Sequence, residues 1–204
     1  MSILVQYVDE ILTPSDNQID FMKAKIKSIK KVLTDNSPIP LKEVHLGGSM
    51  GKGTMLKHKL DGDLIFIYNK IEDFGNNWSK LSKKVYEVLK INFTKIEIEE
   101  AGNLAIHIPT IFNKQEVNFD IVPSYFVTSP KMMKEHANSK MYQGITTIWH
   151  TQYLSRYKNW PYYTHVVRLL KDWKKEHDVN LKNFYLELIT ADVYENFFDK
   201  NYQN

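Results

Sequence analysis

Two aspartates separated by one residue, Asp61 and Asp63, stand at the start of an apolar run that ends at Tyr68. Residues i and i+2 of a β-strand project from the same face, so both carboxylates would point at one spot. Carboxylates held side by side repel each other unless they share a proton or bind a divalent cation. Because hard oxygen ligands favour Mg²⁺, the pair predicts a magnesium site, with a plain turn or a Ca²⁺-type loop as the alternative.

A third acid, Asp120, lies in a segment from 116 to 122 that alternates between apolar and polar residues. Val117 and Phe119 share one face of such a strand, and Asp120 lies on the other. A carboxylate in a mostly buried strand is costly without a cation nearby, although a strand cap is the simpler interpretation. If this strand lies beside the Asp63 strand, three carboxylates converge and could hold two Mg²⁺, as phosphoryl-type transfer requires.

The glycine-rich stretch 47–54, GGSMGKGT, precedes the aspartate pair. Glycines such as Gly48 let the backbone approach a phosphate, Ser49 adds a hydroxyl donor and Lys52 adds a mobile cation. The spacing does not fit the Walker A pattern, and the stretch alone could be a surface turn. The glycine-rich stretch, the aspartate pair and the third aspartate follow one another in the sequence. This order favours a site that binds both an anion and a cation.

The elements that must position these residues follow from apolar periodicity. Ser15 and Gln18 form a capping-box pattern at the start of an amphipathic helix that runs to about Leu33. Further patterns predict strands at 44–46, 63–68 and 116–122, a helix around 78–89, a hairpin about 101–103, and helices at 162–177 and 185–198. We therefore expect an α+β fold, with a mixed sheet and flanking helices over 1–130 and a helical lobe over 131–204.

Composition narrows the classes of protein. The chain has 204 residues, 43% of them hydrophobic, which is enough for a buried core. It lacks cysteine, any run long enough for a membrane helix, and a visible secretory signal, so we expect a cytoplasmic protein without a membrane partner. The net charge is +3, but the segment 131–175 holds nine basic and two acidic residues. That segment suits a polyanionic ligand, or else is a solvated lysine-rich face.

The segment 46–68, LGGSMGKGTMLKHKLDGDLIFIY, resembles the signature of the DNA polymerase β-like nucleotidyltransferases. Within that superfamily it is most similar to the 2′-5′-oligoadenylate synthases. The segment NFDIVPSY at 118–125 resembles their third-carboxylate segment, and VVRLLKDWKKEH at 166–177 with NFYLELITADVYENF at 183–197 resembles their helical lobe. The N-terminal helix is similar to that of related bacterial cyclic-oligonucleotide synthases.

The resemblance implies a polymerase β-like core and a role for each matching residue. Asp61, Asp63 and Asp120 would bind two Mg²⁺, or Mn²⁺ as a substitute, and Asp120 would help to deprotonate the attacking ribose hydroxyl. The nucleotide would be bound by Gly48, Ser49, Lys52, Lys171 and Tyr185, the last by stacking on a nucleobase. From the residues alone, Lys171 could equally be a solvated helix lysine and Tyr185 a core aromatic.

The expected activity is the joining of NTPs, ATP above all, through a ribose hydroxyl with release of pyrophosphate. The product would be a short linear 2′-5′ or cyclic oligonucleotide in antiviral defence, with double-stranded RNA as a partner of 131–175. The alternatives are a CCA-adding-type transferase acting on RNA 3′ ends and a catalytically silent nucleotide- or RNA-binding sensor.

Several residues depart from the family pattern or carry no clear role. Phe184 stands where the synthases usually carry Gln, and their helical lobe extends beyond the match, so a minimal enzyme or a piece of a longer one is expected. His45 and His58 are expected to be structural or exposed rather than catalytic bases.

Overall fold

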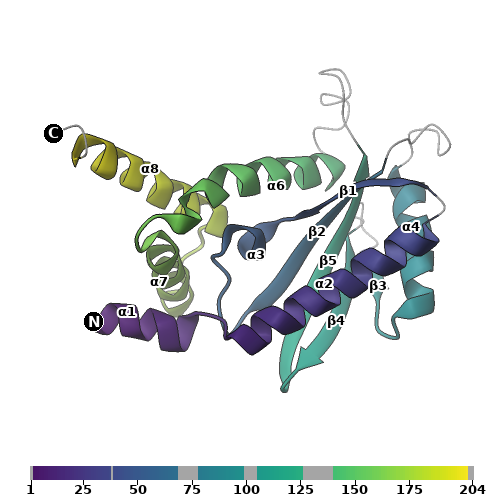
Figure 1. Ribbon diagram of the computed structural model, residues 1–204, viewed down its shortest axis with the longest axis horizontal. Coiled ribbons are helices and arrows are strands. Elements are labelled where there is room, and N and C mark those ends of the chain that lie inside the picture. The colour runs from purple at the N-terminus through teal and green to yellow at the C-terminus, as the bar shows by residue number, and fades with distance from the viewer. Residues whose placement is uncertain (1, 38, 69–77, 99–104, 126–139, 202–204) are drawn as a thin grey trace.

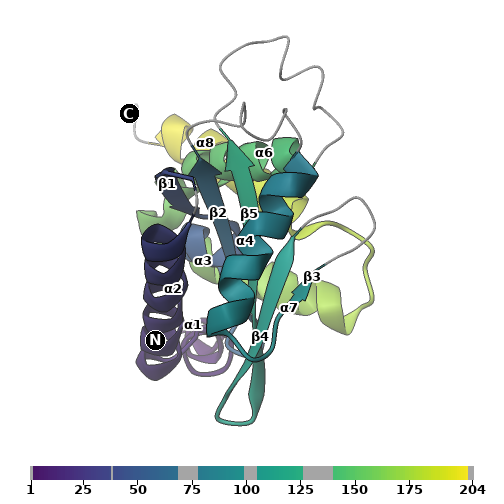
Figure 2. The ribbon, with the colours of Figure 1, turned by 90° about the vertical axis from the view of Figure 1, so that its right-hand side faces the viewer.

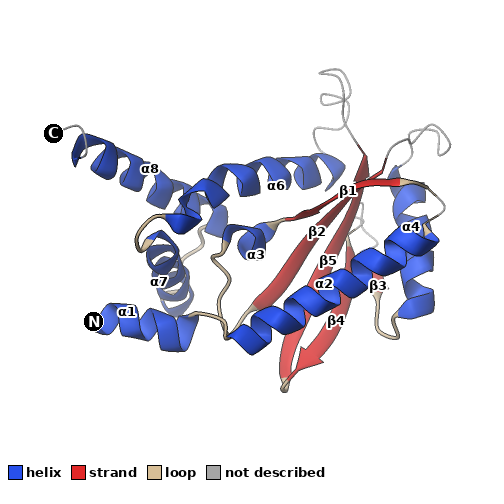
Figure 3. Cartoon of the chain, viewed as in Figure 1, coloured by secondary structure: helices blue, strands red, loops and turns tan. Residues whose placement is uncertain are grey.

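The computed structural model describes residues 2–37, 39–68, 78–98, 105–125 and 140–201 and has the predicted α+β architecture (Figure 1). One five-stranded sheet is flanked by helices, and a group of helices extends from one end of it (Figure 3). The elements are α1 (Ile3–Tyr7), the π-helix η1 (Val8–Leu12), α2 (Asp16–Asn36), β1 (Leu41–Leu46), α3 (Gly48–Lys52), β2 (Leu60–Tyr68), α4 (Trp78–Asn92), β3 (Glu97–Ile98), β4 (Ile106–Phe112), β5 (Gln115–Tyr125), α6 (Lys140–Leu154), the 3₁₀-helix η3 (Ser155–Asn159), α7 (Tyr163–Glu176) and α8 (Asn183–Asn201).

The sheet has the strand order β1-β2-β5-β4-β3. β2 and β5 are parallel neighbours, and the other pairs are antiparallel. In the parallel pair Asp63 lies directly opposite Asp120, and Asp61 lies opposite Asn118. The mixed sheet is thus as predicted. β3 and β4 also pair as the hairpin pattern requires, although the turn at 101–103 lies outside the described residues.

The start of α2 shows the predicted capping box. The Ser15 hydroxyl oxygen accepts a bond from the Gln18 backbone N–H at 3.4 Å, and the Ser15 N–H donates to Gln18 Oε1 at 2.9 Å. These bonds satisfy two groups that a helix N-terminus otherwise leaves unpaired. The apolar stripe then buries Met22, Ile29 and Leu33 completely, which fixes α2 on the sheet.

The two faces of the sheet have different chemistry. On one face, Leu60, Leu64 and Phe66 of β2 share a core with α2 and α4 (Figure 2). The opposite face is apolar at one end, where Ile65 and Ile67 of β2 pack with α6, and polar at the other, where the aspartates lie. Since side chains alternate along a strand, the buried apolar residues force Asp61, Asp63 and Asp120 onto this second face.

The helices beyond the sheet have their own core, made by Leu154, Tyr157, Tyr163, Val167 and Ala191. The N-terminal α1 and η1, which the sequence patterns did not predict, contact α7: Tyr7 donates a hydrogen bond to Asp172 at 2.9 Å. The N-terminal segment therefore packs against α7, and the boundary at residue 130 stays a prediction. Among the described helices, none has the length and hydropathy of a membrane span.

Gly62 separates the two aspartates and faces the core. A Cβ there would lie 2.7 Å from Cδ1 of Phe119 and 3.0 Å from its Cε1, both closer than packed carbon atoms approach. Phe119 is fully buried and cannot retreat. Because Gly62 has no side chain, β2 can pair with β5 while the Phe119 ring occupies the space beside Gly62.

We expect Gly62→Ala to lower the free energy of unfolding by about 1–3 kcal/mol, because it overpacks the core against Phe119. Urea denaturation would measure the loss. The double variant with Phe119→Leu should be more stable than the sum of the two single losses predicts, because the smaller side chain opens the space. Strict additivity would contradict the packing explanation.

Candidate active site

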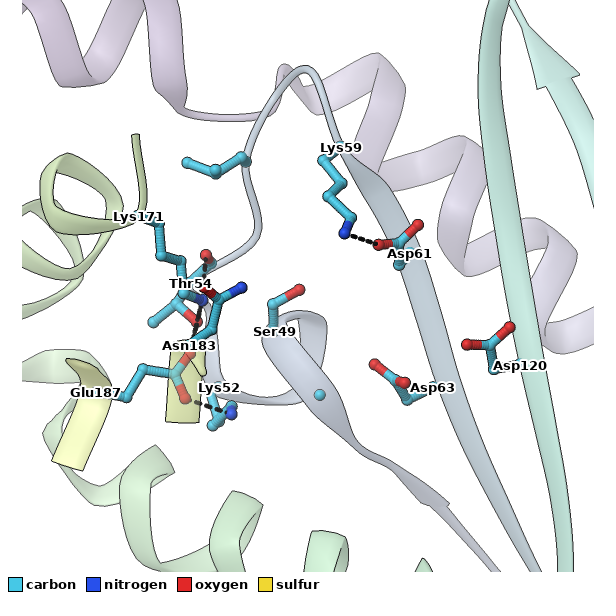
Figure 4. A pocket seen from close by; sticks show the side chains of 12 residues that line it. Ser49, Lys52, Thr54, Lys59, Asp61, Asp63, Asp120, Lys171, Asn183 and Glu187 are labelled. Atoms are coloured by element: carbon cyan, nitrogen blue, oxygen red, sulfur yellow. Dashed lines mark hydrogen bonds and ion pairs between the residues drawn. The ribbon is translucent and has the colours of Figure 1, made fainter. Parts of the chain in front are cut away.

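The polar end of the sheet forms one wall of a cavity of about 230 Å³ (Figure 4). α3 forms a second wall, and α7 and α8 close the side opposite the sheet. The cavity brings together Gly48, Ser49, Lys52, Asp61, Asp63, Asp120 and Lys171, which are the predicted site residues apart from Tyr185. Leu56, Thr54, Lys59, Asn183 and Glu187 also line it and were not predicted.

The in-register pairing makes Asp63 and Asp120 direct neighbours on adjacent strands, and such strands usually lie about 4.8 Å apart. Two of the three carboxylates at this end of the cavity contact basic side chains. Asp61 lies 3.5 Å from Nζ of Lys59, and Oδ1 of Asp120 lies 2.6 Å from Nδ1 of His107, its partner on β4. Among the described residues, no group of three or more Asp, Glu or His side chains is arranged so that it could hold a metal ion.

At this end of the cavity, Asp63 is the carboxylate whose pKa is shifted most clearly. Burial raises the pKa of its carboxyl, and the charges of Asp120 and Asp61 raise it further. Lys52 and Lys59 lower it, but the pKa still rises to about 6. Ionised Asp63 therefore lacks sufficient compensation, which makes this end of the cavity attractive to a cation.

The glycine-rich stretch forms the single-turn helix α3 and packs directly on Asp63. Gly48 has φ of +57°, and a Cβ there would lie 1.6 Å from Oδ2 of Asp63. The Gly47 N–H also donates to the Asp63 carbonyl at 2.8 Å. The sequence predicted glycines for approach to a phosphate; in the structure they permit the approach of the loop to the aspartate strand.

The opposite end of the cavity is cationic and centres on Glu187 of α8. Glu187 forms an ion pair with Lys52, and its Oε1 lies 2.6 Å from Nζ of Lys171. The Thr54 hydroxyl donates to Glu187 at 2.8 Å, and Lys171 donates to the same hydroxyl oxygen at 2.9 Å. All of these side chains are buried, so two lysines share one carboxylate and one positive charge remains.

The titration of this network follows from burial and from the lysines. Burial alone would raise the pKa of Glu187, but Lys171 and Lys52 outweigh it and lower the pKa. Burial lowers the pKa of Lys171, which Glu187 counteracts. The three charges therefore depend on one another, and removing one leaves the others uncompensated.

Glu187 and His107 are site residues that the sequence analysis missed. Glu187 is an acid in the otherwise apolar run 186–189, and His107 lies between the buried Ile106 and Ile108. An isolated polar residue inside an apolar pattern was the available signal in both cases. Its partner could not be inferred, because each partner lies on another element.

Arg168, one turn before Lys171 on α7, holds the chain that follows α3. Its guanidinium donates to the carbonyls of Gly53 at 2.8 Å and Met55 at 3.1 Å. These bonds connect the loop to the helix that carries Lys171, so the two cationic walls of the cavity are positioned together.

Tyr185 lies outside the cavity, with 49% of its surface exposed. At about 100° per residue, it lies roughly 200° around α8 from Glu187, so the two side chains leave opposite sides of the helix. Its stacking on a nucleobase stays a prediction that this position does not favour. His45 lies 2.8 Å from Glu43, and His58 is exposed; neither lines the cavity, as expected.

No model of a protein family matches the chain. The 2′-5′-oligoadenylate synthase 1A of Rattus norvegicus is 25% identical over 200 residues, covering 88% of this chain and 55% of the synthase. The oligonucleotide cyclase CdnC of Escherichia coli is 26% identical over 179 residues, covering 83% and 56%. The chain thus spans about half the length of these relatives. The Mus musculus protein described as inactive 2′-5′ oligoadenylate synthetase 1C is also similar, at 23% identity, so similarity alone does not decide activity.

Solved structures show the same fold. The structure of E. coli CdnC with ATP has a TM-score of 0.63 at 18% identity, covering 95% of this chain and 64% of that one. The GLD-2/RNP-8 complex has a TM-score of 0.67 at 16% identity, covering 94% and 60%. The resemblance predicted from the sequence is thereby confirmed. The chain has the fold of the polymerase β-like nucleotidyltransferases and is similar in sequence to 2′-5′-oligoadenylate synthases and bacterial oligonucleotide cyclases.

Proposed function

We propose that the chain is a divalent-metal-dependent nucleotidyltransferase that joins NTPs through a ribose hydroxyl and releases pyrophosphate. The observation that carries this proposal is the parallel register of Asp63 and Asp120, with Asp61 beside them in the cavity that Ser49 and Lys171 also line. One end of the cavity thus offers carboxylates and the other offers cationic side chains, which suits a substrate with both phosphates and bound metal ions.

The carboxylate end fits Mg²⁺ or Mn²⁺ by its donor set. Asp61, Asp63 and Asp120 provide only hard oxygen atoms, which Mg²⁺ and Mn²⁺ prefer. The raised pKa of Asp63 indicates that nearby cationic groups do not fully compensate its negative charge. Divalent ions held by these residues would supply Lewis-acid chemistry, neutralising the donor phosphates and acidifying the acceptor hydroxyl. The remaining steps rest on the side chains of this chain.

In the reaction, the oxygen of an acceptor ribose hydroxyl forms a bond to the α-phosphorus of the donor. The bond from that phosphorus to its bridging oxygen breaks, and pyrophosphate leaves with the electron pair. We assign to Asp120 the acceptance of the hydroxyl proton, and His107 at 2.6 Å holds that carboxylate in place. Ser49, Lys52 and Lys171 would bind the donor triphosphate, helped by the surplus positive charge around Glu187.

The relatives suggest the substrate and the product. ATP as donor is supported by the structure of E. coli CdnC with ATP, and a short linear or cyclic oligonucleotide is supported by the names of the synthases and the cyclase. A role in antiviral defence and double-stranded RNA as a partner of 131–175 stay predictions. Within that segment, Arg168 and Lys171 point into the protein rather than toward solvent.

Transfer to RNA 3′ ends is the second candidate. The non-canonical poly(A) polymerase complex GLD-2–GLD-3 has a TM-score of 0.67 at 17% identity, and the structure of E. coli CdnC with ATP has a TM-score of 0.63. Mass spectrometry after incubation with all four NTPs, with and without added RNA, separates the candidates. Short oligonucleotides support the first proposal, and extended RNA supports the second.

The first prediction about the candidate active site concerns the carboxylates. Asp63→Asn and Asp120→Asn should each abolish incorporation of radiolabelled NTP in the presence of Mg²⁺, because each removes an oxygen ligand from the cavity. Glu116→Gln is the matched control, since Glu116 is exposed on the same strand as Asp120 and outside the cavity. Undiminished product from either aspartate variant would refute the catalytic assignment.

The second prediction uses stability and needs no activity. Asp63 has a folded-state pKa of about 6, above its ordinary value of 3.8, so its ionised form destabilises the native state above pH 6. Without divalent ions, Asp63→Asn should be more stable than the wild type at pH 8, by up to about 2–3 kcal/mol. The difference should vanish below about pH 4, where Asp63 is protonated in both states.

Added Mg²⁺ should raise the thermal midpoint of the wild type at pH 8 and leave that of Asp63→Asn almost unchanged. Differential scanning fluorimetry measures both midpoints. A wild type that does not respond to Mg²⁺ or Mn²⁺ would argue against a metal site here.

The third prediction concerns Glu187. Glu187→Ala leaves Lys52 and Lys171 buried without a counter-ion and should lower the free energy of unfolding by about 3 kcal/mol. Asp35→Ala removes an exposed ion pair with Lys31 and should cost less than about 1 kcal/mol. Equal losses in urea denaturation would show that the buried network contributes no more than a surface pair.

A further inference from the structure

A second groove, of about 470 Å³, opens beside the candidate active site. The two share Leu56, Lys59, Lys171 and Asn183, so they have a common wall between the end of α7 and the segment that leads into β2. Figure 4 shows Lys171 and Asn183 on the side of the cavity away from Asp120, and Lys59 beside Asp61. A ligand that passes Lys171 therefore enters the groove without leaving the protein surface.

The groove adds cations that the active site does not use. Lys174 and Lys175 line it from the last turn of α7, His58 lines it from the facing segment, and Asp178 is the one acid among its lining residues. Lys174 donates to Oδ1 of Asn183 at 3.0 Å, and Lys175 is exposed. Within the described part of the chain, neither lysine has a carboxylate within ion-pair distance.

The volumes of the cavity and the groove also indicate that a ligand would extend from one into the other. The active-site cavity of about 230 Å³ falls below the roughly 300–1,000 Å³ of ordinary small-molecule sites, and the groove falls within that range. A nucleoside triphosphate bound at the aspartates would thus extend beyond the cavity, and the adjoining groove is lined by Lys174 and Lys175.

We propose that this groove binds a chain of phosphates that continues from the active site, with Lys174 and Lys175 as its contacts. The inference deepens the proposed function and rests on it for the identity of the ligand. The phosphates have two sources with the same chemistry: the terminal phosphates of the donor, which leave as pyrophosphate, or the 5′-triphosphate of the acceptor.

The direct test is binding of inorganic tripolyphosphate by calorimetry at low salt. The double variant Lys174→Ala/Lys175→Ala should weaken binding about tenfold, and Lys175→Ala alone about threefold. The Lys175 side chain has no hydrogen bond or ion pair with any described residue, so its variant should keep the wild-type melting temperature. Lys83→Ala/Lys84→Ala, an adjacent exposed pair on α4, is the matched control and should change binding less than twofold.

Raising the salt concentration should weaken binding to the wild type more than to the double variant, because exposed charges are screened. Equal losses in the two double variants, or no loss from either groove lysine, would overturn the inference. If the wild type transfers no nucleotide but its tripolyphosphate binding still depends on Lys174 and Lys175, the proposed function fails and the groove assignment stands.

Transfer assays distinguish the two sources. Short primers with a 5′-triphosphate or a 5′-hydroxyl are compared as acceptors at a fixed NTP concentration. If the groove holds the acceptor, the wild type prefers the triphosphorylated primer and the double variant loses that preference. If it holds the donor, the KM for NTP rises equally with both primers.

Discussion

The parallel pairing of β2 with β5 is the constraint on which the site depends. It sets Asp63 opposite Asp120, and a shift of one residue would turn one of them toward the apolar core. Leu64 and Phe66 on β2 and Phe119 on β5 are fully buried on the other face, so such a shift would expose these apolar side chains to solvent. Hydrophobic burial thereby holds two carboxylates close together against their mutual repulsion.

The same burial explains why glycines flank the aspartates on both sides of the sheet. On the core face, Gly62 leaves room for Phe119, and on the polar face Gly48 leaves room for the Asp63 carboxylate. Both positions are limited by atoms that lie within 3 Å of where a Cβ would be. The positive φ of Gly48 adds a second reason, since other residues adopt that conformation at a cost.

Local patterns made much of the fold predictable. The capping box at Ser15, the alternating strand around Asp120 and the amphipathic α7 depend on residues close in sequence, and all three formed as expected. The two-residue turn of Asn113 and Lys114 between β4 and β5 gave a weaker signal, because its left-handed residues include no glycine. Strand order and parallel direction depend on contacts between distant segments, which periodicity does not report.

The site was predictable to the same extent. The sequence analysis named the aspartates and Ser49, which line the cavity, from local motifs, whereas Glu187 and His107 contact partners on other elements. The role of Tyr185 stays a prediction; a helix turns by about 100° per residue, so the phase of α8 decides which side its ring faces. The helix phase is fixed by which neighbours are buried, here Leu186 and Glu187.

Charge is divided across the cavity in a way that links its two ends. Asp61 and Asp120 contact Lys59 and His107, and Lys52 and Lys171 contact Glu187. Each of these groups already has a partner, so a metal–nucleotide complex must offer better ones at both ends together. Cations bound at the aspartates would release Lys59, which also lines the groove beyond Lys171. On the proposed function, occupation of the carboxylate end would therefore add a cation to the path of the phosphates, so that metal and triphosphate favour each other's binding.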